Sequence, residues 1–121
     1  MAQQHLPLSE RALELIAHRF KLLSEPTRLR LLQLLMGGEK SVNELVSASN
    51  TMQANVSKHL GILADGGLVA RRKVGVSIYY GIADPSIYTL CDLVCHSLQE
   101  RGEQVLRTLR PDEDEGLGTR D

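Results

Sequence analysis

Between residues 53 and 73, polar and cationic side chains recur at spacings suited to contacting a nucleic acid. In the stretch Gln53–Gly66, QANVSKHLGILADG, apolar residues follow helical spacing: Val56, Leu60, Ile62 and Leu63. The opposite face of this helix would carry polar side chains only: Gln53, Asn55, Ser57, Lys58 and His59. A helix lying in the major groove of DNA needs one stripe packed on its own domain and another that offers amide, hydroxyl and cationic groups to bases and phosphates. The alternative is an ordinary amphipathic surface helix, whose outer face is polar because water wets it.

The residues after this helix predict a basic β-hairpin. Asp65-Gly66-Gly67 ends the helix, since glycine adopts the left-handed conformation of a C-terminal cap at little cost. Residues 68–82 then predict paired strands, with Gly75 supplying the positive φ of the tight turn and Arg71-Arg72-Lys73 lying on the first strand. A polar-faced helix followed directly by a basic hairpin is typical of a winged helix-turn-helix.

Shorter helices must precede the polar-faced helix and position it. Ser9 caps a first helix that runs to about residue 23, and Pro26 stands near the start of a second that ends at glycines 37 and 38. Ser41 and Glu44 form a capping box at the start of a third, short helix. Residues 47–50 are small and polar, and they predict the turn of a helix-turn-helix. The expected fold is mainly α with a small β-hairpin wing, in the order α-α-α-α-β-β-α.

The last predicted helix has more apolar surface than one small domain covers. It starts at Asp84-Pro85 and runs to about Leu109, with a broad apolar face. The first helix has an apolar stripe of its own, and a second copy of the chain is the simplest cover for both. A homodimer through the first and last helices would set its reading helices about one DNA turn apart, matching a palindromic operator. The alternative is that both helices close the core of a monomer.

Composition predicts one globular domain with a separate charged end. Residues 111–121 hold five acids and one base, which leaves 13 basic and 10 acidic residues in 1–110. We therefore expect an N-terminal tail (1–8), a winged helix-turn-helix domain with dimerisation helices (9–110) and an acidic disordered tail (111–121). No apolar run approaches a membrane span and no signal peptide is present, so the cytoplasm is the expected location. Phosphate-cradling glycine loops, clustered metal ligands and nucleophile motifs are absent, which argues against an enzyme.

The segments SEPTRLRLLQLL and SVNELVSASNTMQANVSKHLGILADGGLVARRKVGVSIYYGIAD resemble the ArsR/SmtB family of dimeric winged-helix repressors. The similarity covers roughly residues 20–107, and its most specific motifs are EPTRLRLL, VSKHLGIL and the wing pattern GLV–R–G–YY. The resemblance implies a homodimer whose first and last helices form the interface. It also implies a repressor that occupies an operator in double-stranded DNA until a ligand weakens binding.

The same resemblance implies which residues contact DNA. On the family's DNA-contact positions stand Gln53, Asn55, Ser57, Lys58 and His59, with Arg71, Arg72 and Lys73 holding the backbone or a minor groove beside the wing. Gln53 and Asn55 suit adenine edges, whereas Ser57 and Lys58 suit phosphates. His59 has two alternatives: it points into the groove, or it bonds back to its own domain.

The chain departs from two of the metal-site patterns of the family that it resembles. Ser41 and Asn43 stand where the arsenic- and cadmium-type site has thiolates, so that site is not expected. The zinc-type site keeps Asp84 and Glu100, but serine replaces both of its histidines. Two scattered oxygens make a poor zinc site, so zinc sensing through it is not expected either.

Cys91 and Cys95 are the remaining candidates for sensing an effector. Cysteines four apart share one face of a helix, here inside the stripe assigned to the dimer interface. Thiolates from both subunits could bind As(III), Cu(I) or another thiophilic ion, or the thiols could be oxidised or persulfidated. The alternative is that both are small apolar packing residues, in a repressor that needs no ligand. A further alternative is a winged helix used as a protein-interaction module without DNA binding.

Overall fold

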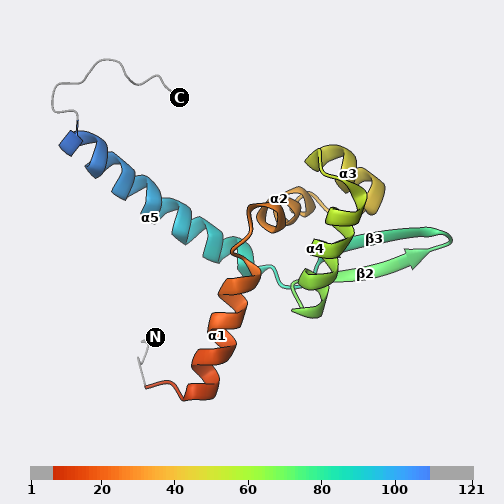
Figure 1. Ribbon diagram of the computed structural model, residues 1–121, viewed down its shortest axis with the longest axis horizontal. Helices are drawn as coiled ribbons and strands as arrows, with labels where there is room; N and C mark the ends of the chain where they lie inside the picture. Colours follow the sequence, from red (N-terminus) through yellow and green to blue (C-terminus); the bar gives the residue numbers. More distant parts are fainter. Residues whose placement is uncertain (1–6, 110–121) are drawn as a thin grey trace. The chain divides into compact units, whose positions relative to one another are not determined.

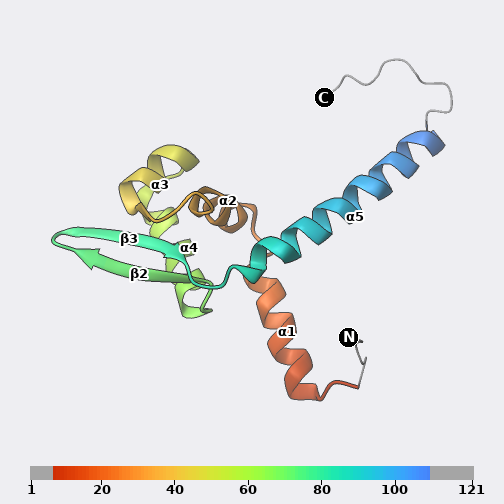
Figure 2. The same cartoon turned by 180° about the vertical axis from the view of Figure 1, so that it is seen from behind.

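The computed structural model describes residues 7–109, so the predicted acidic tail (111–121) and most of the predicted N-terminal tail lie outside it. The chain divides into two compact units, residues 1–84 and 85–121, which are described separately. The elements, labelled in Figure 1 and seen from behind in Figure 2, are α1 (Glu10–Leu22), α2 (Pro26–Leu35), β1 (Lys40–Ser41), α3 (Val42–Ser49), α4 (Gln53–Asp65), β2 (Val69–Val74), β3 (Ser77–Ile82) and α5 (Ser86–Leu109).

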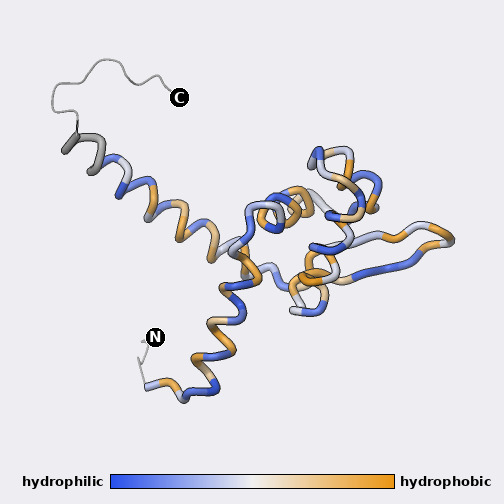
Figure 3. Tube along the Cα trace, in the orientation of Figure 1, coloured by the Kyte–Doolittle hydropathy of each residue, from blue (hydrophilic) through white to orange (hydrophobic). Residues whose placement is uncertain are grey.

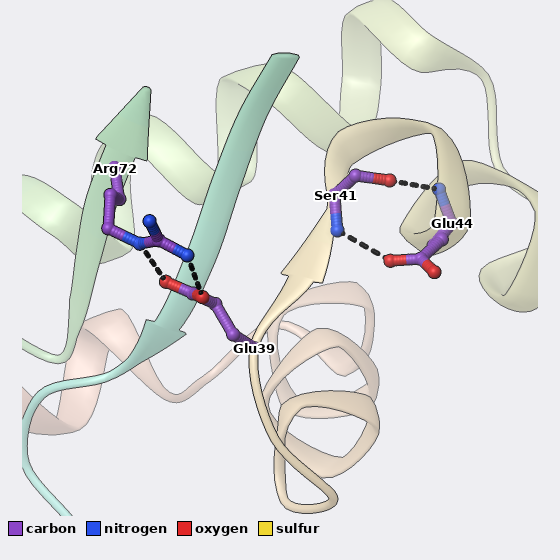
Figure 4. Close-up of polar contacts among 4 residues, drawn as sticks. All are labelled: Glu39, Ser41, Glu44 and Arg72. Carbon is purple, nitrogen blue, oxygen red and sulfur yellow. Dashed lines mark hydrogen bonds and ion pairs between the residues drawn. The ribbon is translucent and has the colours of Figure 1, made fainter. Parts of the chain in front are cut away.

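Helix starts follow the local signals in the sequence. Ser9 Oγ accepts a hydrogen bond from the Ala12 amide at 3.1 Å, and Pro26 is the first residue of α2. The predicted capping box is confirmed: the Glu44 amide donates to Ser41 Oγ at 3.1 Å, and the Ser41 amide donates to Glu44 Oε1 at 2.8 Å (Figure 4). Side chains within three residues therefore satisfy amides that the first helical turn leaves without partners.

The turn between α3 and α4 is shorter than the sequence predicted. Residues 47–49, predicted as turn, belong to α3, which ends at Ser49. Asn50 then adopts the left-handed conformation with φ 55°, and its amide donates to the Val46 carbonyl. Asparagine tolerates this conformation better than most residues, so Asn50 is what ends the helix.

A third strand joins the predicted hairpin. The β2–β3 hairpin is confirmed, with Gly75 in its turn at φ 63°, and Arg71 pairs with Tyr80 across the strands. The short β1 pairs antiparallel with β3, which gives the sheet order β1-β3-β2. The predicted order of elements lacked β1 because two residues carry no periodicity and their partners lie about 40 positions away.

The core of the first unit lies where α2, α3 and α4 meet the base of the hairpin. Its large, fully buried side chains are Leu31, Leu35, Leu45, Val56, Leu60, Leu63 and Leu68. The hairpin extends away from these helices in both views (Figures 1 and 2), and the outer residues 71–76 are all exposed. The core therefore fixes the inner side of α4 and leaves the hairpin's outer part in solvent.

Apolar side chains are exposed on α1 and on α5, each considered by itself. On α1, Leu13, Ile16 and Phe20 are exposed. On α5, Leu93 and Leu98 are each 65% exposed, and Figure 3 shows apolar residues recurring along this helix. Among the helices within residues 7–109, none has the length and apolar character needed to cross a membrane.

Candidate nucleic-acid interface

Helix α4 has one fully buried stripe and one free polar face. Val56, Leu60 and Leu63 are 0% exposed and pack on the core, whereas Ile62, predicted for the same stripe, is only half-buried. The outer side chains Gln53, Ser57 and Lys58 are exposed and Asn55 is half-buried. Within residues 7–109, none of these four side chains makes a hydrogen bond or an ion pair. Their donors and acceptors are therefore free for an external partner.

His59 lies on the packed side of α4, although it was predicted to lie on the polar face with the other DNA contacts. It is 7% exposed, and its Nδ1 lies 3.1 Å from Arg28 Nη1. Arginine can only donate, so Nδ1 accepts and the imidazole is neutral with its proton on Nε2. Burial lowers the pKa of His59 from 6.5, the charges of Arg28 and Lys58 lower it further, and Glu25 opposes them. Of the two alternatives stated from the sequence, bonding within the domain is the one observed.

Arg28 is a structural residue that the sequence reasoning missed. Its side chain is buried, with Nε donating to the Leu22 carbonyl at 2.7 Å and Nη2 to the Lys21 carbonyl at 3.2 Å. These carbonyls close α1, where the negative end of the helix dipole favours a cation. A signal was available: Arg28 continues the apolar stripe of α2, three and four residues before Leu31 and Leu32.

A second contact joins α1 to the other end of α4. Arg19 Nη2 donates to the Gly66 carbonyl at 3.4 Å, and Arg19 Nη1 donates to Asp84 Oδ2 at 3.1 Å. Leu22 packs so closely on Gly66 that a Cβ there would require the Leu22 side chain to shift. Asp84, expected as a helix cap, is thus the partner of a cation on α1, and α5 begins at Ser86, one residue after the predicted Pro85.

The three wing cations divide into two groups. Arg72 donates from Nε to Glu39 Oε2 at 2.9 Å and from Nη2 to Oε1 at 2.6 Å (Figure 4). Its guanidinium also lies 5.7 Å from the centre of the Tyr79 ring. The hydrogen bond from Arg72 lowers the pKa of Glu39, so both partners are charged at neutral pH. Arg72 therefore fastens β2 to the segment before β1.

Arg71 and Lys73 lie on the opposite face of β2 from Arg72, because successive side chains of a strand alternate. Both are exposed, and in the described part of the chain neither has an ion-pair or hydrogen-bond partner. Figure 3 shows β2 as the hydrophilic strand of the hairpin. The wing thus offers two uncommitted positive charges on one face.

The cysteines are free thiols on α5. Cys91 is half-buried and Cys95 is exposed. The described residues contain no group of three or more histidine, cysteine, aspartate or glutamate side chains able to hold a metal ion. Among the described residues, therefore, no third ligand of these types completes a site with Cys91 and Cys95.

Known proteins resemble this chain both in sequence and in fold. The family described as "Bacterial regulatory protein, arsR family" matches residues 25–71. The uncharacterised HTH-type transcriptional regulator Rv0081 of Mycobacterium tuberculosis is 41% identical over 83 residues, which is 68% of this chain and 73% of that protein. The crystal structure of Rv0081 aligns with a TM-score of 0.73 and 35% identity, covering 81% of this chain and 99% of the other.

Two further solved structures share the fold. One is the solution structure of Mb0332 from Mycobacterium bovis, described as a homodimeric winged helix-turn-helix DNA-binding domain and a possible ArsR-family regulator. It has a TM-score of 0.68 and 34% identity over 86% of this chain and 95% of that one. The other is the antimony-specific transcriptional repressor AntR, with a TM-score of 0.71 and 29% identity over 83% and 92%. On its sequence, its fold and these relatives, the chain belongs to the ArsR/SmtB family of winged helix-turn-helix transcriptional repressors.

Proposed function

We propose that this repressor binds a palindromic operator as a homodimer, with α4 in the major groove and the wing beside it. The observation that carries the proposal is the free polar face of α4, which stands opposite a fully buried stripe. A helix built this way is held rigidly by its domain while its outer donors and acceptors stay available. The description of Mb0332 as a homodimeric DNA-binding domain supports the proposal by similarity.

The free side chains divide into base-reading and phosphate-binding groups. Gln53 and Asn55 carry the amide groups that pair with adenine edges. Ser57 and Lys58 suit phosphates, and Arg71 and Lys73 add positive charge from the wing. We assign Arg72 to holding the wing and not to DNA, since Glu39 already accepts from the Nε and Nη2 edge of its guanidinium. His59 is likewise left out of the contact set, because it is buried.

The exposed apolar residues of α1 and α5 support dimerisation through these helices. Leu13, Ile16 and Phe20 are between 41% and 53% exposed in the single chain. Leu93 and Leu98 on α5 are exposed to a still greater degree. Burying such apolar surface contributes about 25 cal/mol of favourable free energy per Å². A second copy of the chain would bury it in a dimer interface.

Fluorescence anisotropy with a labelled duplex from upstream of the protein's own gene tests DNA binding. Affinity should fall steeply as salt rises, and Lys58→Ala should weaken binding and reduce the salt slope by about one. Lys21→Ala is the matched control, because it removes an exposed lysine from α1 and should leave the slope unchanged. A monomer in sedimentation, together with absent or salt-insensitive binding, would favour the protein-interaction module instead.

We further propose that an effector acts at Cys91 and Cys95. Both are free thiols with some exposure, four residues apart on α5. Soft thiolates from two subunits would together hold a thiophilic ion such as As(III), which one chain's pair cannot surround alone. Binding would change the relative orientation of the two winged domains and so weaken the operator complex. AntR, an antimony-specific repressor, supports a thiophilic effector by similarity.

The effector proposal is tested by the same anisotropy assay with reduced, As(III)-treated and peroxide-treated protein. Arsenite should release the duplex from the reduced wild type and not from Cys91→Ser or Cys95→Ser. Release by peroxide alone would assign the thiols to redox sensing, in which the peroxide takes two electrons from two thiols. If neither treatment changes the affinity of any variant, the cysteines are packing residues of a ligand-independent repressor.

A further inference from the structure

The inner side of α4 is held by a polar contact as well as by the apolar core. Arg28 of α2 donates from three nitrogens to two different elements: the Lys21 and Leu22 carbonyls at the end of α1, and His59 of α4. Both Arg28 and His59 are more than 90% buried. One guanidinium therefore spans from the end of α1 to the middle of α4.

From this arrangement we propose that Arg28 and His59 are positioning residues for the reading helix, tying α4 to the end of α1 only while His59 is neutral. The inference rests on the proposed function, in which α4 enters the major groove. His59 directly follows Ser57 and Lys58, which lie on the free outer face. A displacement at His59 is thus transmitted within one helical turn to the assigned phosphate contacts.

Protonation removes the tie for two physical reasons. The Nδ1 atom loses its lone pair to the proton and can no longer accept from Arg28. A buried imidazolium would also stand 3.1 Å from a buried guanidinium. The charged groups that face His59 are Arg28 from α2, Lys58 from α4 and Glu25 at the start of α2, so two cations oppose one carboxylate. The contact favours the neutral ring and is weakened by acid.

The direction of the pH effect follows from the lowered pKa of His59. In the unfolded chain the imidazole titrates near 6.5, whereas in the folded protein it titrates below that value. The stabilisation is therefore fully present above pH 6.5 and is lost as the pH falls through the lower folded pKa. Operator affinity should decline over the same range, since the reading helix loses its tie.

The decisive variant is His59→Gln, whose neutral amide carries an oxygen that can accept from Arg28 and does not titrate. As the pH is lowered from 7.5 through the folded titration of His59, the wild type should lose roughly five- to tenfold in affinity for the promoter duplex, a typical size for coupling. His59→Gln should lose clearly less over the same range. His18→Gln is the matched control, because it removes an exposed imidazole from α1 and should keep the wild-type profile. Equal pH profiles for wild type and His59→Gln would overturn the inference.

A second readout separates this inference from the proposed function. In ¹H–¹⁵N NMR spectra without DNA, backbone signals of residues 53–65 should shift together with the titration of His59. In His59→Gln these shifts should be absent. If no variant binds the duplex, the proposed function fails, and the NMR titration still decides whether the tie exists. Titration of His59 without any response along α4 would overturn the tie itself.

Discussion

Replacing Gly66 with alanine should destabilise the protein through one steric contact with α1. An added Cβ would lie 2.3 Å from Leu22 Cδ1, which is 1.1 Å short of the 3.4 Å of ordinary contact. Gly66 has φ −83°, so the backbone itself accepts alanine. Leu22 is only 6% exposed, and its methyl group must move within packed surroundings. Overpacking of this kind costs about 1–3 kcal/mol, partly offset by about 0.4–1 kcal/mol from a less flexible unfolded chain.

Gly61→Ala provides the matched control within the same helix. Gly61 lies in the interior of α4, and an added Cβ meets nothing within 4 Å. This substitution should stabilise the protein by roughly 0.5–1 kcal/mol, because alanine is the better helix former. Thermal denaturation is followed by circular dichroism at one fixed protein concentration. Compared with the wild type, Gly66→Ala should have a lower Tm and Gly61→Ala a higher one. Equal changes in Tm would refute the idea that Leu22 packs against Gly66.

Three further predictions follow from individual contacts. Arg71→Ala should reduce the salt slope of DNA binding by about one, whereas Arg72→Ala should change it less, since Arg72 already pairs with Glu39. Fluorescence anisotropy across a salt series measures the slope for both variants. Ser41→Ala should cost about 1 kcal/mol in urea denaturation, because the Glu44 amide loses its cap. Asn50→Gly should leave the unfolding free energy almost unchanged, but Asn50→Ala should lower it by roughly 1–2 kcal/mol, given the left-handed backbone. Identical urea midpoints for these last two variants would contradict the assigned role of Asn50.

Local chemistry in the sequence was enough to predict most of the elements. Ser9, Pro26 and the Ser41–Glu44 box act on amides within a few residues, so their effects can be read without a fold. The division of α4 into an apolar stripe and a polar face depends only on helical periodicity. Gly75 marked the hairpin turn for the same reason, since its φ of 63° is a local requirement.

Tertiary structure decided which polar groups stay free and which are used inside the fold. Arg72 meets Glu39 across 33 positions, and His59 meets Arg28 across 31. Spacing along one helix or strand therefore did not identify either partner. The pairing of β1 with β3 likewise joins residues about 40 positions apart, so local spacing did not predict it. The sequence by itself determined most helix starts and the apolar stripe of α4, because those effects act over a few residues. Only the packed chain shows that His59 and Arg72 already have partners inside the fold, because a side chain's availability depends on which distant segments lie against it.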